Sequence, residues 1–298
     1  EEWGFDGMVC TDANAMQAAS QAYKYFPTVE DAAAGTVKAG TAVMLAGDAA
    51  AMRQALTDGK LTTADMDGAL RGNFRMRFRL GEFDPPAQMP YSTVDGNSTP
   101  WTSDSAKALA RLVTQKSIVL LKNEGSLLPL DKSTLKSLAV IGPNADLVAS
   151  DWYGGKPPYT VTALAGIKAA VGTGVNVQYA LDNSTGQAVT LATSSDAAIV
   201  VVGNHPTCNA GWATCASPND GKEAVDRKSI DLKPEQLTLI QAVYAANKRT
   251  VVVQVSSFSQ AITWVQDNVP AIVHLTHSSQ ELGNALADYH HEAAVECW

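Results

Sequence analysis

Residues 197–202 read AAIVVV, and this unbroken apolar run decides the fold. A strand that is apolar on both faces belongs in a sheet covered on both sides, which is typical of parallel α/β sheets. A run at residues 117–121 is followed by further buried strands, which are predicted at 138–141, 175–179, 250–255 and 271–275. Helices are expected between them, near residues 103–115, 162–171, 187–194, 234–246 and 280–289. The pattern predicts one α/β sandwich with a mainly parallel sheet from residue 103 onward.

The N-terminal part has a different pattern. A short apolar strand at 8–10 is followed by a helix near 28–39, a strand at 42–45, and helices near 48–57 and 63–80. Two βα units are about a quarter of a (β/α)8 barrel, which needs about 250 residues. We expect this segment not to close a barrel by itself. Because its open sheet edges invite pairing, it should pack on the sandwich, stay partly disordered or self-associate.

Composition excludes several classes of protein. The net charge is -8, and this acidic balance argues against a nucleic-acid partner. The basic run of Arg71, Arg75, Arg77 and Arg79 is interpreted as a solvated face near a helix C-terminus. No apolar run approaches the roughly 18 residues of a membrane span, so no membrane partner is expected. The sequence has no Gly-x-Gly-x-x-Gly, no His-Glu-x-x-His and no zinc-type Cys/His spacing. We therefore expect no metal and no organic cofactor.

The cysteines do not decide the cellular compartment of the protein. Cys208 and Cys215 lie in a Gly/Pro/Asn-rich loop, where a disulfide in an exported protein and two free thiols are equally compatible with the sequence. Glu1 is not a natural start, so the chain is expected to begin inside a longer protein. The localisation stays unassigned, with the periplasm or secretion suspected.

Two carboxylates stand in motifs of their own. Asp12 ends the stretch GFDGMVCTD at residues 4–12, where the carboxyl end of a buried strand would present it at a site mouth. Glu223 lies in GKEAVDR at 221–227, in a long loop after the strand at 197–202. Two acids from different elements suit retaining glycoside hydrolysis, in which one attacks the anomeric carbon and one protonates the leaving oxygen. The alternatives are a helix-capping role for Asp12 and a solvated loop acid for Glu223.

These motifs resemble those of family 3 glycoside hydrolases, the β-glucosidase and β-xylosidase family. Other stretches carry the resemblance along nearly the whole chain: GEFD at 81–84, SIVLLKNE at 117–124, LLPL at 127–130, VIGPNA at 140–145, YGGKPPY at 153–159 and QELGNALAD at 280–288. The resemblance implies the last two βα units of a TIM-like barrel at 1–84, a linker at 85–102, and an α/β sandwich at 103–298 that is truncated at its C-terminus.

The resemblance also implies a function. It indicates a retaining, exo-acting β-glycosidase that hydrolyses non-reducing-end bonds of an oligosaccharide or an aryl or alkyl glycoside by double displacement. Asp12 maps to the nucleophile and Glu223 to the acid/base. Five further residues are expected to contact substrate: Trp152, Tyr153, His205, Trp212 and Arg227. The aromatic residues, with Tyr159 nearby, have hydrophobic loop anchoring as their alternative role, and His205 has a hydrogen bond to backbone.

Departures from the family pattern keep other functions open. Ala13 follows Asp12 where the family usually has Trp, and no Lys-His dipeptide occurs, although the family holds the sugar with one. After Asp288 the sequence leaves the family pattern, which reads as a truncation or a frameshift. The alternatives are therefore a truncated, non-catalytic carbohydrate-binding or orphan α/β module, or a different hydrolase activity on the residual pocket.

Overall fold

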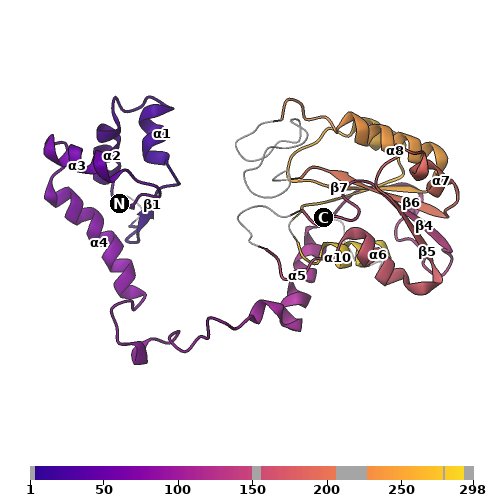
Figure 1. Ribbon diagram of the computed structural model, residues 1–298, viewed down its shortest axis with the longest axis horizontal. Coiled ribbons are helices and arrows are strands. Elements are labelled where there is room, and N and C mark those ends of the chain that lie inside the picture. The colour runs from indigo at the N-terminus through magenta and orange to yellow at the C-terminus, as the bar shows by residue number, and fades with distance from the viewer. Residues whose placement is uncertain (1–3, 150–155, 206–226, 278, 292–298) are drawn as a thin grey trace. The chain divides into compact units, whose positions relative to one another are not determined.

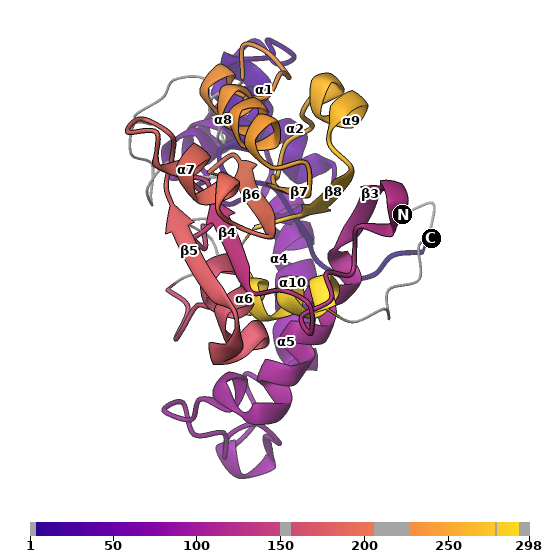
Figure 2. The same ribbon diagram turned by 90° about the vertical axis from the view of Figure 1, so that its right-hand side faces the viewer.

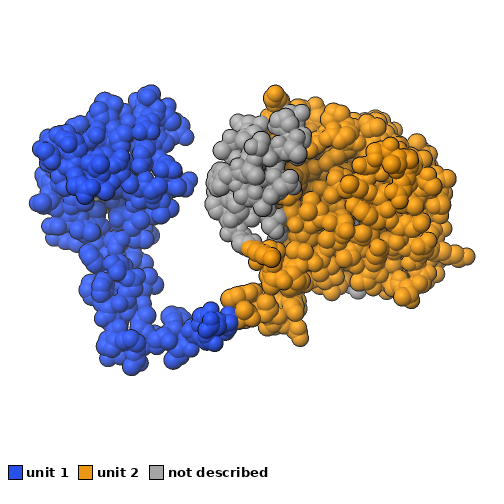
Figure 3. Space-filling model, in the orientation of Figure 1, with its two compact units in different colours: residues 1–98 blue, residues 99–298 orange. Residues whose placement is uncertain are grey.

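The computed structural model describes residues 4–149, 156–205, 227–277 and 279–291. The chain forms two compact units, residues 1–98 (unit 1) and residues 99–298 (unit 2), shown in Figure 3. Each unit is described by itself.

Unit 2 is built on a six-stranded sheet (Figure 1). Its strands in chain order are β3 (Val119–Asn123), β4 (Ser137–Ile141), β5 (Asn176–Ala180), β6 (Ala197–Gly203), β7 (Thr250–Val255) and β8 (Ala271–Leu275). The strand order is β3-β8-β7-β6-β4-β5. All neighbours are parallel except β3, which runs antiparallel to β8 along the edge. The mainly parallel α/β sheet predicted from the sequence is confirmed.

Helices cover both faces of this sheet (Figure 2). They are α5 (Asp104–Ser117), α6 (Ala163–Val171), α7 (Gln187–Thr193), α8 (Pro234–Ala246), α9 (Thr263–Asn268) and α10 (Leu282–His291). Strand residues alternate between two cores: Ile199 and Val201 pack with residues of α6 and α10. Val200 and Val202 pack with residues of α7, α8 and α9. All seven residues of β6 are buried, as the apolar run predicts for a strand covered on both sides.

Two glycines set the spacing of the helices on one face. A Cβ on Gly166 in α6 would lie 2.0 Å from the backbone oxygen of Gly283 in α10. A Cβ on Gly283 would lie 1.9 Å from the backbone oxygen of Thr162. The backbones can approach this closely only because neither residue carries a side chain.

Unit 1 contains a two-stranded parallel sheet made of β1 (Val9–Cys10) and β2 (Thr41–Val43). Its helices are α1 (Ala15–Gln21), α2 (Val29–Lys38), α3 (Ala49–Thr57) and α4 (Thr63–Arg79). Side chains cap three of them at the N-terminus: Thr28 for α2, Asp48 for α3, and Thr62 with Asp65 in a capping box for α4. The sequence predicted these three helices but not α1.

The strands of unit 1 are thinly covered. Both residues of β1 are exposed, and the 17-residue helix α4 has no buried residue. The segment before β1 is held to α4 by polar contacts, in which Arg75 donates to the backbone oxygen of Asp6 and Arg79 forms an ion pair with its carboxylate. The Arg79 guanidinium holds the pKa of the Asp6 carboxyl below its ordinary value. The described part of this unit is an open pair of strands with helices.

Short turns join the elements. The 3₁₀ turns η1 (Pro86–Gln88) and η2 (Pro100–Thr102) occur between α4 and α5, while η3 (Glu124–Ser126) and η4 (Gly172–Gly174) lie within unit 2. Among the described residues, no helix combines the length and apolar character needed to cross a membrane.

Candidate active site

Asp12 lies two residues after the end of β1 and is exposed. The corner before it is fixed on β2, because the backbone N–H of Thr11 donates to the Val43 oxygen at 3.0 Å. The Leu45 N–H donates to the Thr11 hydroxyl oxygen at 3.1 Å. One carboxylate oxygen of Asp12 accepts from the Ala13 N–H at 2.7 Å. Asp12 is thus an exposed carboxylate at the carboxyl end of a parallel strand, with its orientation set by backbone.

The alternative role of Asp12 as a helix cap is not what the structure shows. The N-cap of α1 is Asn14, with a left-handed φ of 59° and no side-chain capping bond. The Asp12 carboxylate accepts from the N–H of Ala13, which precedes the helix. The side chain therefore does not serve the first turn of α1 in the way that Thr28 serves α2.

In unit 2, polar groups gather at the carboxyl edge of the sheet. Gly142 follows β4 with a φ of 119°, and a Cβ on it would lie 2.2 Å from the Val201 oxygen. Gly203 ends β6 with a φ of 141°, and a Cβ on it would lie 1.7 Å from the Val255 oxygen. The chain therefore turns tightly against the neighbouring strand at both places. The turns place Asn144 and Asn204, both buried, just beyond the strand ends.

The end of β6 is held from two sides. The buried amide of Gln236, on α8, accepts from the Gly203 N–H at 3.1 Å and donates to the Gly203 oxygen at 2.8 Å. Asn204 accepts from the Ser257 N–H at 3.1 Å through its side-chain oxygen. His205 follows directly and is partly buried, and its burial lowers the pKa of the imidazole below 6.5. The neutral ring is thereby favoured, which suits a hydrogen-bonding role.

Arg227 connects two loop segments. One terminal nitrogen donates to the Asp231 oxygen at 2.7 Å and the other to the Ser259 oxygen at 3.5 Å. A parallel bridge between Asp231 and Ala261 joins the same segments. The Nε of Arg227 is buried and has no acceptor among the residues that the structure describes. These backbone partners give Arg227 an anchoring role, and its predicted contact with substrate stays a prediction.

Four predicted site residues lie outside the described residues: Glu223, Trp152, Tyr153 and Trp212. The same holds for Cys208 and Cys215. The nearby Tyr159 is described, and its hydroxyl donates to the Glu281 carboxylate at 2.5 Å and accepts from the Gln280 amide at 3.2 Å. Desolvation and Glu281 raise the pKa of Tyr159 to about 12. Tyr159 thus belongs to a polar network with the approach to α10.

Sequence reasoning missed the buried amides at the sheet edge. Gln236 and Asn204 stand in ordinary helical and loop contexts, and their partners come from distant segments. The glycines at the ends of β4 and β6 were the available signal. Within the described ranges, no group of three or more His, Cys, Asp or Glu side chains is arranged to hold a metal ion.

Comparison with known proteins places these features in a family. Residues 118–289 match the model of the glycosyl hydrolase family 3 C-terminal domain. The chain is 33% identical over 230 residues to a β-xylosidase from Formosa agariphila, covering 71% of this chain and 29% of that protein. It thus spans less than a third of the length of this curated relative.

Solved structures show the same likeness. A β-glucosidase from Erythrobacter marinus superposes with a TM-score of 0.80 at 27% identity, over 97% of this chain and 42% of that one. A GH3 exo-β-xylosidase in complex with a xylobiose aziridine activity-based probe gives a TM-score of 0.79 at 28% identity, over 97% of this chain and 37% of that one. With the family model matching more than half of its length, the chain belongs to glycosyl hydrolase family 3.

Proposed function

We propose that this chain carries the catalytic pair of a retaining, exo-acting β-glycosidase of the β-xylosidase or β-glucosidase type. Asp12 is the nucleophile and Glu223 the acid/base. The observation that carries the proposal is the setting of Asp12, an exposed carboxylate held by the Ala13 N–H at the carboxyl end of β1. That is where barrel enzymes keep their catalytic groups.

The family relatives support the class of substrate. The proteins that this chain resembles include a β-xylosidase and a β-glucosidase, and one solved relative is an exo-β-xylosidase in complex with a xylobiose-based probe. We infer that the substrate here is a β-xyloside or β-glucoside with its sugar at the non-reducing end. The division into βα units up to residue 84, a linker at 85–102 and a sandwich from 103 belongs to the same proposal.

The chemistry proceeds in two displacements. An oxygen of Asp12 attacks the anomeric carbon while the bond to the leaving oxygen breaks, and Glu223 gives that oxygen its proton. Glu223 then takes a proton from water, whose oxygen displaces Asp12 from the same carbon. The sugar leaves with retained configuration, and both carboxyl groups return to their starting states. No cofactor takes part in this scheme.

Substituting Asp12 tests the nucleophile. We expect Asp12→Ala to reduce turnover of an activated aryl β-xyloside by the full-length chain to background, and azide to restore turnover in Asp12→Gly. Asp48→Ala is the matched control, since Asp48 also follows a strand of unit 1 but caps α3 through Ala50 and Ala51. Turnover by Asp12→Ala at the level of Asp48→Ala would remove Asp12 from the chemistry.

Substituting Glu223 tests the acid. Glu223→Ala should slow substrates with poor leaving groups by about 10²–10⁴-fold, because these need protonation. An aryl glycoside with a good leaving group should lose much less in its first displacement. Equal loss on both substrates would show that Glu223 is not the acid.

A second candidate is a non-catalytic carbohydrate-binding or orphan α/β module. It is favoured by Ala13 beside the nucleophile position. Sugar binding measured by calorimetry, with no turnover of any aryl glycoside, would support this candidate over the first. Turnover that survives both acid substitutions would instead support a different hydrolase activity on the residual pocket. Self-association through the open strands of unit 1 stays a prediction.

A further inference from the structure

A cavity of about 600 Å³ lies at the carboxyl edge of the unit 2 sheet. Its lining comes from the turn after β4, the loop after β5 and the first turns of α8. Pockets for small molecules typically have volumes of about 300–1,000 Å³. Its size and its origin in three separate segments make it a candidate ligand site.

The topology of the sheet favours this position. β4 lies between β5 and β6 in the sheet. After β4 the chain forms β5 along one edge of β4, and it then crosses over to form β6 along the opposite edge of β4. The helix after β4 packs on one face and the helix after β6 on the other. In doubly wound sheets, ligands bind outside the carboxyl ends of the strands where the strand order reverses in this way. The cavity lies beside that point, on the face covered by α8.

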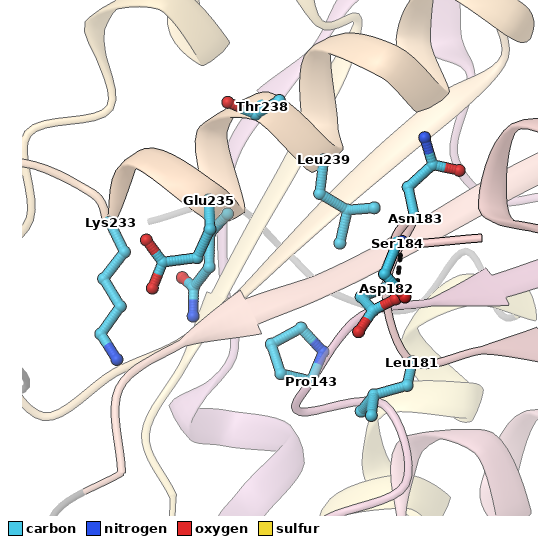
Figure 4. Close-up of a pocket in the computed structure, with 10 residues that line it drawn as sticks. Pro143, Leu181, Asp182, Asn183, Ser184, Lys233, Glu235, Thr238 and Leu239 are labelled. Atoms are coloured by element: carbon cyan, nitrogen blue, oxygen red, sulfur yellow. Dashed lines mark hydrogen bonds between the residues drawn. The ribbon is translucent and has the colours of Figure 1, made fainter. Parts of the chain in front are cut away.

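The walls combine apolar and charged groups. Figure 4 shows Lys233, Glu235, Thr238 and Leu239 on α8 and its approach, facing Asp182, Asn183 and Ser184 across the cavity, with Pro143 and Leu181 below. The hydrogen bond from Ser184 lowers the pKa of the Asp182 carboxyl, so Asp182 is an acceptor at neutral pH. The Gln236 amide is already bonded to Gly203 and serves as wall.

This lining selects a class of ligand by its chemistry. Two carboxylates accept hydrogen bonds and one amine donates, so a group that both donates and accepts, such as a hydroxyl, matches both sides. Two acids against one base disfavour an anion. Pro143 and Leu239 offer apolar surface to the C–H face of a ring.

We propose that this cavity, which is lined by residues of unit 2 alone, binds a neutral saccharide independently of hydrolysis. None of the described lining residues is aromatic, so stacking is absent there and binding is weak. We expect a dissociation constant on the order of 1 mM for methyl β-xyloside. Glucuronate, which carries the wrong charge, binds more weakly.

The test is a titration of the ¹⁵N-labelled full chain with methyl β-xyloside and with glucuronate, followed by amide chemical shifts. The xyloside should move resonances of residues 181–184 and 233–239 in a saturable way. Absence of these shifts, or glucuronate binding as tightly as the xyloside, overturns the proposal.

A bulky side chain introduced into the cavity should block binding, and the same substitution outside the cavity is its control. Thr238 is exposed and lines the cavity, whereas Ala245 is exposed two turns further along α8 and does not. Thr238→Trp should weaken binding by about tenfold or more, and Ala245→Trp should keep it within about twofold. Equal binding by both variants overturns the proposal. If Thr238→Trp does not fold, Glu235→Gln replaces it, with severalfold weaker binding expected and unchanged binding counting against the site.

Asp12→Ala separates this site from the proposed catalysis. Binding at the cavity should be unchanged in that variant, whether or not turnover is lost. A loss of the shifts at residues 181–184 in Asp12→Ala would place the sugar at the catalytic centre instead and refute a separate site.

Discussion

Strands β1 and β6 carry similar sequence signals and have different surroundings. Each is an apolar run, followed in one case by Thr11 and Asp12 and in the other by Asn204 and His205. All residues of β6 are buried between β4 and β7, under helices on both faces. Both residues of β1 are exposed, and its single described neighbour is β2.

The difference shows what an apolar run can and cannot predict. It indicates that a strand forms, but its burial depends on how many neighbours the rest of the chain supplies. In unit 2, five other strands and two helix layers complete the core. In unit 1, buried apolar side chains occur mainly on the helices, in two small clusters. Stability should therefore respond to core substitutions far more strongly in unit 2.

The largest expected effect tests this contrast by shortening one apolar side chain in each strand. Ile199→Ala in β6 should lower the free energy of unfolding of unit 2 by about 2–5 kcal/mol, because it leaves a cavity in a fully packed core. Val9→Ala in β1 should change stability by roughly 0.5 kcal/mol or less, since Val9 is 46% exposed. Urea unfolding followed by circular dichroism measures both. Equal costs would break the comparison.

A second pair of substitutions should have opposite signs in the two units. Gly283→Ala in α10 should destabilise unit 2 by about 1–3 kcal/mol or more, because the new methyl group meets the Thr162 backbone. Gly68→Ala in α4 should stabilise unit 1 by about 0.5–1 kcal/mol, since a Cβ there meets nothing within 4 Å. Thermal unfolding of both variants gives the signs. A stabilised Gly283→Ala would show that α6 and α10 can separate freely.

The smallest expected effect concerns pH. The pKa of Tyr159 is about 12 in the folded protein against an ordinary value of 10.0, so the folded state binds this proton more tightly. The resulting stabilisation is fully present below about pH 10 and is lost as the pH rises towards 12. Tyr159→Phe should flatten the fall in melting temperature over this range. Phenolate absorbance should show a late-titrating component that is reduced in Tyr159→Phe, and an identical titration of the variant would contradict the assignment.

The sheet of unit 2 could be predicted because its signal is local. The run at residues 197–202 has no polar position and the run at 251–253 is all valine, and the glycine and polar stretches around them mark the ends of the strands. Helix α1 was missed because Asn14 makes no side-chain cap. Helix α9 was missed because it has six residues and no capping side chain. The run noted at 117–121 begins two residues before β3, because α5 continues to Ser117.

The candidate site could be predicted only in part. The position of Asp12 after β1 follows from a short local pattern. The partners of Arg227 could not be predicted, because Ser259 belongs to a loop after another strand. The cavity at α8 was unforeseen for the same reason, since Asp182 and Glu235 come together only when the sheet has formed.

The antiparallel edge of the sheet has a consequence for synthesis on the ribosome. Val119 in β3 pairs with His274 in β8, and Arg111 and Gln115 in α5 bond to Asp288 in α10. At roughly 5–20 residues per second, these partners emerge on the order of ten seconds after α5 and β3. During this interval the nascent chain exposes the apolar residues of β3 without a partner strand. A chaperone that binds extended apolar segments would therefore have its best opportunity at β3, before translation reaches β8.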